Sequence, residues 1–227
     1  MKALLRLFFR LLYHQFAFTY DLVAAAVSFG HWKDWAMSVI PFIEGTRILE
    51  IGQGPGHLQR VLLDRGLVAV AIDESAPMIR LAKRNVARQP SKSSASTSSP
   101  RKRANLTRGL AQHLPFANDA FDTIVSTFPS EYIFDAQTLS EARRVLRQGG
   151  RLIVLPVALP RNPFLDWLFR VTGESPSEAI EIVKSKLRIP FADAGFETEV
   201  QALDAGSGIL LIILARRNEE MNVEKIP

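Results

Sequence analysis

The residues with the clearest chemical meaning lie between positions 48 and 58, where an apolar run ends in an acid and three alternating glycines. The segment reads Ile-Leu-Glu-Ile-Gly-Gln-Gly-Pro-Gly-His-Leu, with glycine at 52, 54 and 56. Glycine permits positive φ and lets a ligand approach backbone that a Cβ would shield. A strand, a glycine turn and a helix N-terminus together direct N–H groups at a bound nucleotide. The segment therefore predicts a nucleotide cradle.

The spacing of these glycines narrows the choice of ligand. A dinucleotide fingerprint needs glycine where His57 stands, and a P-loop needs a Gly-Lys-Ser/Thr sequence that does not follow. A second apolar run over 67–72 ends in Asp73 and Glu74. An acid about 20 residues beyond the glycine loop can accept hydrogen bonds from ribose hydroxyls. The plainer alternatives are a tight strand–helix connection without a ligand and a solvated helix cap at Asp73.

Elements that would position these residues follow from the hydrophobic pattern. Helical and strand patterns alternate after residue 46, which predicts a doubly wound, mostly parallel α/β sheet. The predicted strands cover 46–51, 67–72, 104–108, 122–127, 151–156, 196–201 and 209–215. The predicted helices cover 57–65, 76–88, 136–148 and about 175–193. Gly149 and Gly150 are interpreted as the C-cap of the third helix, and the link 204–208 as a hairpin that brings in one antiparallel strand.

Length and composition predict one domain. The chain has 227 residues, of which 47% are hydrophobic, enough for a substantial core. We expect an N-terminal helical cap over 1–44, the main domain over 45–217 with a disordered basic insertion at about 90–103, and a tail over 218–227. The absence of cysteine excludes disulfides and thiol chemistry. The four histidines lack zinc-site spacing, so no metal is expected.

The N-terminal helix pattern has two interpretations. Lys2, Arg6 and Arg10 recur every four residues and form one basic stripe on an otherwise apolar helix. Such a helix can make peripheral contact with an anionic membrane through residues 1–18. It can equally pack on the protein's own core or across a dimer, which is the favoured interpretation. No apolar run reaches the roughly 18–20 residues that span a bilayer, and the sequence predicts a cytoplasmic protein.

A basic block follows the predicted second helix. Between Arg80 and Arg108 the chain carries lysine and arginine but no acid. Such a block can attract nucleic acid, anionic lipid or an acidic substrate. It contains no aromatic residue on which bases would stack, so a solvated surface is favoured and nucleic acid is not the expected partner.

Several segments, in the same order, resemble one enzyme family. The pattern E-x-G-x-G-x-G from Glu50 resembles motif I of the class I S-adenosylmethionine-dependent methyltransferases. Further resemblance, to type 11 methyltransferases, lies in 111–116, 121–127 and 145–152, and the segment from Tyr20 to Trp35 resembles the entry segment of ubiquinone/menaquinone C-methyltransferases. The family's fold is a seven-stranded sheet whose final strand is antiparallel.

The resemblance implies S-adenosyl-L-methionine as cofactor and S-adenosyl-L-homocysteine as product. It implies that the glycine turn approaches the methionine part, that Asp73 holds the ribose hydroxyls and that Thr127 lies beside the sulfonium. The implied cofactor-binding residues are Glu50, Gly52, Gln53, Gly54, Gly56, Asp73, Glu74, Met78, Ala111, Gln112 and Thr127. Leu110 stands where the family often has Asp or Asn, so adenine recognition is expected to depend on backbone and apolar contacts.

The implied reaction is an in-line methyl displacement in which a general base is optional. Candidate bases are His14, Tyr20, His31 and Glu131, none with an orienting partner in the sequence. Large apolar side chains suggest a chamber for a small, apolar or lipid-like acceptor, although such residues equally form core; they are Phe8, Phe9, Phe16, Phe18, Trp32 and the segment 164–169. The alternatives are an RNA methyltransferase that uses the basic block and a non-catalytic binding module. The oligomeric state stays open.

Overall fold

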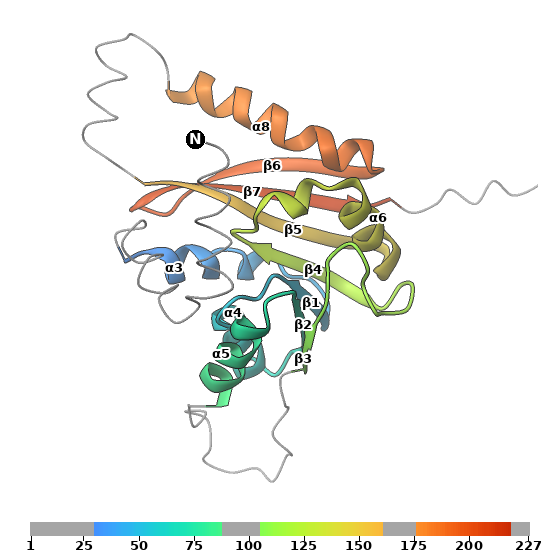
Figure 1. Ribbon diagram of the computed structural model, residues 1–227. Coiled ribbons are helices and arrows are strands. Elements are labelled where there is room, and N and C mark those ends of the chain that lie inside the picture. Colours follow the sequence, from blue (N-terminus) through green and yellow to red (C-terminus); the bar gives the residue numbers. More distant parts are fainter. Residues whose placement is uncertain (1–29, 88–104, 161–175, 219–227) are drawn as a thin grey trace, which may run out of the picture.

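The computed structural model describes residues 30–87, 105–160 and 176–218. These residues form a seven-stranded sheet with helices on both faces (Figure 1). The strands are β1 (Arg47–Ile51), β2 (Val68–Asp73), β3 (Asn105–Arg108), β4 (Phe121–Thr127), β5 (Leu146–Pro160), β6 (Phe196–Asp204) and β7 (Gly208–Arg217). The helices are α3 (Trp32–Met37), α4 (His57–Asp64), α5 (Ala76–Ala87), α6 (Ala136–Val145) and α8 (Pro176–Asp193), with short 3-10 turns η2 (Ile40–Phe42) and η3 (Glu131–Phe134).

The strand order is β3-β2-β1-β4-β5-β7-β6. Strands β1 to β5 run parallel, whereas β7 is antiparallel to both β5 and β6. The doubly wound, mostly parallel sheet and the final hairpin are therefore confirmed. The order reverses between β1 and β4, which are neighbours in the sheet but not in the chain. In open α/β sheets, ligands bind at the carboxyl ends of the strands at such a switch point.

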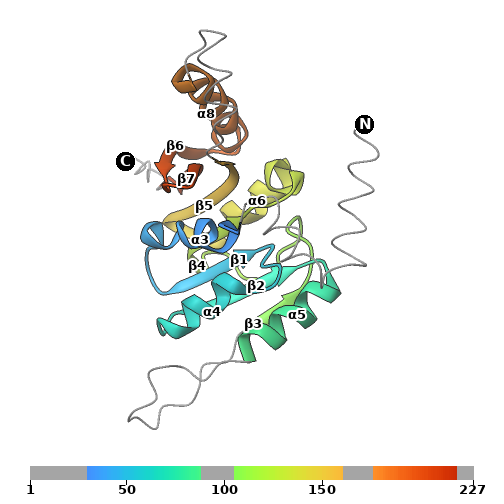
Figure 2. The same cartoon turned by 90° about the vertical axis from the view of Figure 1, so that its left-hand side faces the viewer.

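Two apolar layers cover the sheet. On one face, α3 and α4 contribute Trp35, Leu58 and Leu62 to a cluster with inward-facing strand residues. On the other face, α6 contributes Leu139 and α8 contributes Phe191. Figures 1 and 2 show α8 lying along β6 and β7 at one end of the sheet, with β3 at the opposite end. The strands alternate between these layers because successive side chains point to opposite faces.

One helix boundary was predicted wrongly. The pattern predicted a helix over 136–148 with Gly149 and Gly150 as its C-cap, but α6 ends at Val145 and β5 begins at Leu146. The reason is tertiary: Leu146 pairs with Phe121 of β4, and the register shifts by a bulge immediately after that pair. A Cβ on Gly150 would lie 2.8 Å from a backbone carbonyl oxygen. Gly150 therefore serves the bulged start of β5 rather than a helix cap.

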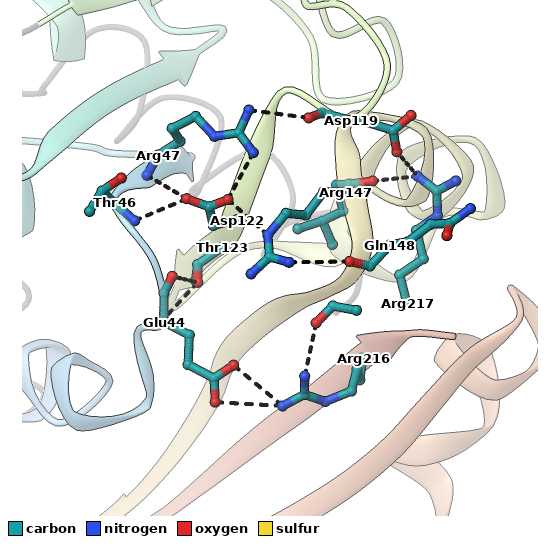
Figure 3. Close-up of polar contacts among 12 residues, drawn as sticks. Glu44, Thr46, Arg47, Asp119, Asp122, Thr123, Arg147, Gln148, Arg216 and Arg217 are labelled. Atoms are coloured by element: carbon teal, nitrogen blue, oxygen red, sulfur yellow. Dashed lines mark hydrogen bonds and ion pairs between the residues drawn. The ribbon is translucent and has the colours of Figure 1, made fainter. Parts of the chain in front are cut away.

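A buried carboxylate fastens the amino ends of β1 and β4 (Figure 3). The glycine turn follows the other end of β1. Asp122, 8% exposed, accepts hydrogen bonds from the backbone N–H groups of Thr46 (3.0 Å) and Arg47 (2.9 Å). It also accepts from the guanidinium groups of Arg47 and Arg147, both at 2.8 Å. Burial alone would raise the pKa of Asp122, but the hydrogen bonds from Arg47 and Thr46 hold that pKa well below its usual range. The cluster thus fixes the two strands whose other ends carry the site.

Candidate functional site

A cleft opens at the carboxyl ends of β1 and β4, where the strand order reverses. Its lining comes from α3, the end of β1, the glycine turn, the start of α4 and the end of β4. The lining residues are Trp32, Lys33, Ala36, Glu50, Gly52, Gln53, Gly54, Pro55, His57, Leu58 and Thr127. Gly52 directly follows β1 and Thr127 ends β4, so the two lie far apart in the chain. The parallel pairing of β1 with β4 brings them together.

The glycine turn has the left-handed backbone that the sequence predicted. The φ angles are 72° at Gly52, 50° at Gly54 and 78° at Gly56. The N–H of Gly52 donates to the carbonyl of Ile72 at 2.8 Å, and the N–H of Gly54 donates to the carboxylate of Asp73 at 3.0 Å. The turn is therefore tied at two points to the end of β2, and any side chain larger than hydrogen at these three positions would be strained.

Gly52 lies directly on the hydroxyl of Tyr132. A Cβ built on Gly52 would be 2.2 Å from the Tyr132 oxygen. That hydroxyl lies 3.2 Å from the Ser126 hydroxyl and 3.3 Å from the carbonyl of Ile51. Tyr132 of η3 therefore packs against Gly52 and supports the turn. Sequence reasoning missed this residue and Ser126; the polar Ser126 inside the apolar strand β4 was the available signal.

Gly56 has a different role from Gly52. A Cβ on Gly56 would lie 2.9 Å from the Cβ of Ala82 in α5, and Gly56 is not among the cleft-lining residues. It is the N-cap of α4, in left-handed conformation. Asn85, also on α5, donates its amide to the carbonyl of Pro55 at 3.0 Å. Close packing of α4 against α5 thus requires Gly56 to be glycine.

Asp73 ends β2 beside the glycine turn. Its carboxylate accepts hydrogen bonds from the N–H of Gly54 at 3.0 Å and from the N–H of Ser75 at 2.8 Å. Each carboxylate oxygen has two acceptor sites and can therefore accept from a ligand hydroxyl as well as from a backbone N–H. Glu74 is exposed, and its carbonyl accepts from the guanidinium of Arg108 at 3.1 Å. The geometry brings Asp73, rather than Glu74, against the turn.

Glu50 is a buried acid at the base of the cleft. It is 2% exposed and accepts a hydrogen bond from the side-chain amide of Gln59 on α4 at 2.8 Å. Burial raises the pKa of Glu50 to about 8, the hydrogen bond from Gln59 lowers it and the charge of Asp73 raises it. At neutral pH the carboxyl is therefore mainly protonated, and it links the end of β1 to α4 as an uncharged group.

Replacing Glu50 with glutamine is expected to flatten the pH dependence of stability. The folded-state pKa of about 8 lies above the ordinary value of 4.5, so the folded protein holds a proton that the unfolded chain releases between these values. The free energy of unfolding is therefore highest, as far as Glu50 contributes, below pH 4.5. It falls as the pH rises from there to about 8, by up to about 1.4 kcal/mol per pH unit. When the melting temperature is measured from about pH 5 to about pH 8, that of E50Q should rise relative to that of the wild type as the pH increases. Parallel curves of melting temperature against pH would contradict the protonated state of Glu50.

An aromatic pair stands at the cleft, where Trp32 is one of the lining residues. The rings of Trp32 on α3 and Phe128 stack with centroids 3.8 Å apart and planes inclined by 29°. Phe128 immediately follows Thr127 and has a φ of 49°, which is uncommon for a residue with a side chain. Its N–H donates to the carbonyl of Leu155 at 2.7 Å, which helps to hold this conformation. The sequence predicts that Trp32 lines an apolar chamber, and it does line this cleft.

The structure does not bring all the predicted residues together. Met78 is fully buried in α5 and Ala111 is 8% exposed; neither they nor the partly buried Gln112 line the cleft. Of the candidate bases, His31 is exposed and stacks on Trp35 at 6.0 Å. Glu131 is exposed at the start of η3. Neither lines the cleft, and the other two candidates, His14 and Tyr20, lie outside the described residues, as does the insertion at 90–103.

Several lining residues were not predicted from the sequence. They are Lys33, Ala36, Pro55, His57 and Leu58. His57 stands at the cleft as the first residue of α4. Within the described ranges, no cluster of His, Asp and Glu would hold a metal ion. In the same ranges no helix is long and apolar enough to cross a membrane.

Comparison with known proteins agrees with this geometry. The family model for a methyltransferase domain matches residues 49–154. A demethylmenaquinone methyltransferase from Lactiplantibacillus plantarum is 32% identical over 170 residues, which are 70% of this chain and 68% of that protein. A ubiquinone/menaquinone biosynthesis C-methyltransferase from Geotalea daltonii is 32% identical over 149 residues, which are 63% of this chain. The chain spans 60% of the length of the latter relative.

Solved structures share the fold. A methyltransferase from Methanosarcina mazei, described as dependent on S-adenosylmethionine, has a TM-score of 0.54 at 22% identity, covering 80% of this chain and 98% of that one. Magnesium protoporphyrin IX methyltransferase from Synechocystis, solved with bound S-adenosylhomocysteine, has a TM-score of 0.52 at 18% identity, covering 82% and 83%. At these identities the likeness concerns the fold alone.

Proposed function

The chain belongs to the class I S-adenosylmethionine-dependent methyltransferases, and from this premise we propose that it transfers a methyl group from S-adenosylmethionine to a small, apolar acceptor by in-line displacement. The observation that carries the proposal is the glycine turn, with its backbone exposed to the cleft and its Gly54 N–H held by Asp73. A nucleoside ligand needs both an open backbone and an acid for its ribose hydroxyls.

The residues present fit such a donor. The glycine turn offers backbone without a Cβ, and the Asp73 carboxylate beside it can accept from ribose hydroxyls. Thr127 ends β4 and lines the same cleft as the glycine turn. Gln53 lines the cleft with a buried amide that has no partner among the described residues. We assign the ribose to Asp73, the methionine part to the glycine turn and the sulfonium to the vicinity of Thr127.

The kind of acceptor is inferred from the aromatic pair Trp32 and Phe128. Trp32 and Phe128 present stacked rings beside Thr127, where the methyl group would leave the donor. Aromatic rings favour offset stacking with flat apolar partners. Of the two relatives named above, one is named a demethylmenaquinone methyltransferase and the other a ubiquinone/menaquinone biosynthesis C-methyltransferase. We therefore propose an acceptor with a flat apolar ring, of the kind found in quinone precursors.

The chemistry requires alignment more than proton transfer. A sulfonium donor, when bound, supplies an already activated methyl group and a neutral thioether leaving group. The chain then has to hold the acceptor atom in line with that methyl group and exclude water. Trp32 and Phe128 would do both, because their stacked rings form an apolar wall.

An acceptor panel tests the proposed function. Release of S-adenosylhomocysteine should rise with a demethylated quinone solubilised in detergent and stay at background with RNA. Replacing Trp32 with alanine should lower kcat/KM for the quinone by roughly 10-fold or more, because the ring's apolar and stacking contacts are lost. The same variant should bind S-adenosylhomocysteine almost as the wild type does.

Two outcomes would contradict the proposal. Stimulation by RNA that weakens with rising salt would favour an RNA methyltransferase. If calorimetry detects binding of neither S-adenosylmethionine nor S-adenosylhomocysteine to the full chain, the methyltransferase proposal fails. The remaining alternative is then a non-catalytic binding module that keeps the fold.

A further inference from the structure

The indole N–H of Trp35 is bound to a residue far along the chain. It donates to the hydroxyl of Ser207 at 2.9 Å, across 172 positions of sequence. Trp35 lies on α3, and Ser207 lies in the turn between β6 and β7, which passes beside that helix (Figure 1). Trp35 is 3% exposed, and a buried indole N–H that loses its partner destabilises the fold. The bond therefore ties α3 to the sheet at one defined point.

Helix α3 is too short to fix its own orientation. It has six residues, and its N-cap His31 makes no side-chain hydrogen bond to the helix. A helix of this length is not stable by itself in water. Trp35 packs in the apolar cluster that also contains Leu58 and Leu210. Apolar packing is not directional, whereas the hydrogen bond to Ser207 has a defined direction and sets the rotation of the helix about its axis.

The turn that carries Ser207 has a defined geometry of its own. The Asp204 carboxylate accepts a hydrogen bond from the N–H of Gly206 at 2.8 Å. The N–H of Ala205 donates to the carbonyl of Gly208 at 2.9 Å, and Gly206 has a φ of 75°. A bond from aspartate to the backbone two residues on is typical of tight turns. The turn therefore holds the Ser207 hydroxyl in place for α3.

The orientation of α3 decides where the Trp32 ring lies in the cleft. Trp32 stands three residues before Trp35, so the two side chains are neighbours on the helix surface. The Trp32 ring stacks on Phe128 with 3.8 Å between centroids. Phe128 and Ala205 of the turn pack against the same apolar cluster as Trp35. A rotation of α3 that broke the bond to Ser207 would therefore move the Trp32 ring relative to Phe128.

We propose that Ser207 is a positioning residue for the acceptor: through Trp35 it sets the orientation of α3 and hence of the Trp32 ring. The inference rests on the proposed function and deepens it by adding a residue that acts through the helix. The donor side is held separately, because the glycine turn is tied to β2 through Ile72 and Asp73. Loss of the Ser207 hydroxyl is therefore expected to affect the acceptor and to spare the donor.

Four single variants and one double variant of the full chain test this role. S207A removes the hydroxyl, S207T keeps one, W35F removes the indole N–H, and S207A/W35F removes both ends of the bond. Ser38 supplies the matched control S38A, since its hydroxyl donates to the carbonyl of Asp34 on the same helix at 3.3 Å. Methyl transfer to a demethylated quinone in detergent gives kcat and KM, and calorimetry gives the affinity for S-adenosylhomocysteine. Hydrogen exchange follows the backbone amides of α3.

The expected result is selective for the acceptor. S207A and W35F should each lower kcat/KM for the quinone roughly 5- to 10-fold, the effect of one lost hydrogen bond, and the double variant should be no worse than either. S207T and S38A should stay within roughly twofold of the wild type. Affinity for S-adenosylhomocysteine should stay within roughly twofold in every variant. The α3 amides should exchange faster in S207A, whereas those of the glycine turn should not.

Other outcomes overturn the inference and differ from failure of the proposed function. An equal loss of affinity for S-adenosylhomocysteine would show that Ser207 stabilises the domain as a whole. Losses that multiply in the double variant, or unchanged exchange of the α3 amides in S207A, would show that the bond does not position the helix. If the wild type binds S-adenosylhomocysteine but methylates no quinone, the proposed acceptor is wrong, and the exchange measurement still decides whether Ser207 holds α3. S207A and W35F remove the bond from opposite ends, which keeps the test decisive if one of them does not fold.

Discussion

Replacing Asp73 with alanine should weaken binding of S-adenosylhomocysteine on the order of 100-fold or more. A hydrogen bond to a charged group contributes about 1.5–3 kcal/mol, and the proposed ribose contact uses two hydroxyls. The substitution also removes the acceptor of the Gly54 N–H, which lies 3.0 Å from the carboxylate. The glycine turn would thus lose one of its two ties to β2. Calorimetry with the purified full-length variant measures the loss.

The neighbouring Glu74 provides the control for Asp73. It is exposed at the same strand end, whereas the glycine turn donates its Gly54 N–H to Asp73. E74A should therefore bind S-adenosylhomocysteine within roughly twofold of the wild type. If D73A bound the ligand as well as E74A does, with both variants folded by circular dichroism, Asp73 would not be the ribose anchor.

Replacing Gly52 with alanine is expected to damage both the turn and donor binding. The φ of 72° makes any L side chain unfavourable, by roughly 1–2 kcal/mol. The new Cβ would also lie 2.2 Å from the Tyr132 hydroxyl, so the turn or the tyrosine must move. Because the turn contacts the proposed ligand through its backbone, we expect affinity for S-adenosylhomocysteine to fall about 30-fold, equivalent to ~2 kcal/mol.

Two further variants isolate the cause of the Gly52 effect. Gly66 has a φ of 74° with open space around its missing Cβ, so G66A reproduces the backbone strain away from the cleft. It should lower the melting temperature while leaving ligand affinity unchanged. Removing the hydroxyl in the double variant G52A/Y132F relieves the contact, since the nearest ring carbon of Tyr132 would lie 3.3 Å from the new Cβ. Affinity that does not recover in the double variant would refute the steric explanation.

The fold could be predicted from the sequence because the patterns that indicate its elements are local. Alternating strand and helix patterns, the glycine turn after β1 and the short link before β7 each depend on a few adjacent residues. The boundary between α6 and β5 was predicted wrongly because the helical pattern continues past Val145 in the sequence. Pairing of Leu146 with Phe121 across the sheet outweighs that local preference.

Other residues of the site depend on tertiary contacts that local sequence patterns do not show. Gly52 and Asp73 could be identified from spacing, and the structure joins their segments through the Gly54 N–H. Tyr132 could not, because its role arises only when η3 is placed under the turn by the pairing of β1 with β4. Lys33 lies on α3, and its position in the cleft likewise follows from the packing of that helix on the sheet.

The central claim is that the turn at Gly52 and the carboxylate of Asp73 hold the methyl donor. A crystal structure of the full chain with S-adenosylhomocysteine tests it most directly. We predict both ribose hydroxyls within about 2.6–3.2 Å of the Asp73 carboxylate, the sulfur beside Thr127 and the methionine part at the glycine turn. Ligand density elsewhere on the molecule, or in the cleft with the ribose turned away from Asp73, would contradict the account.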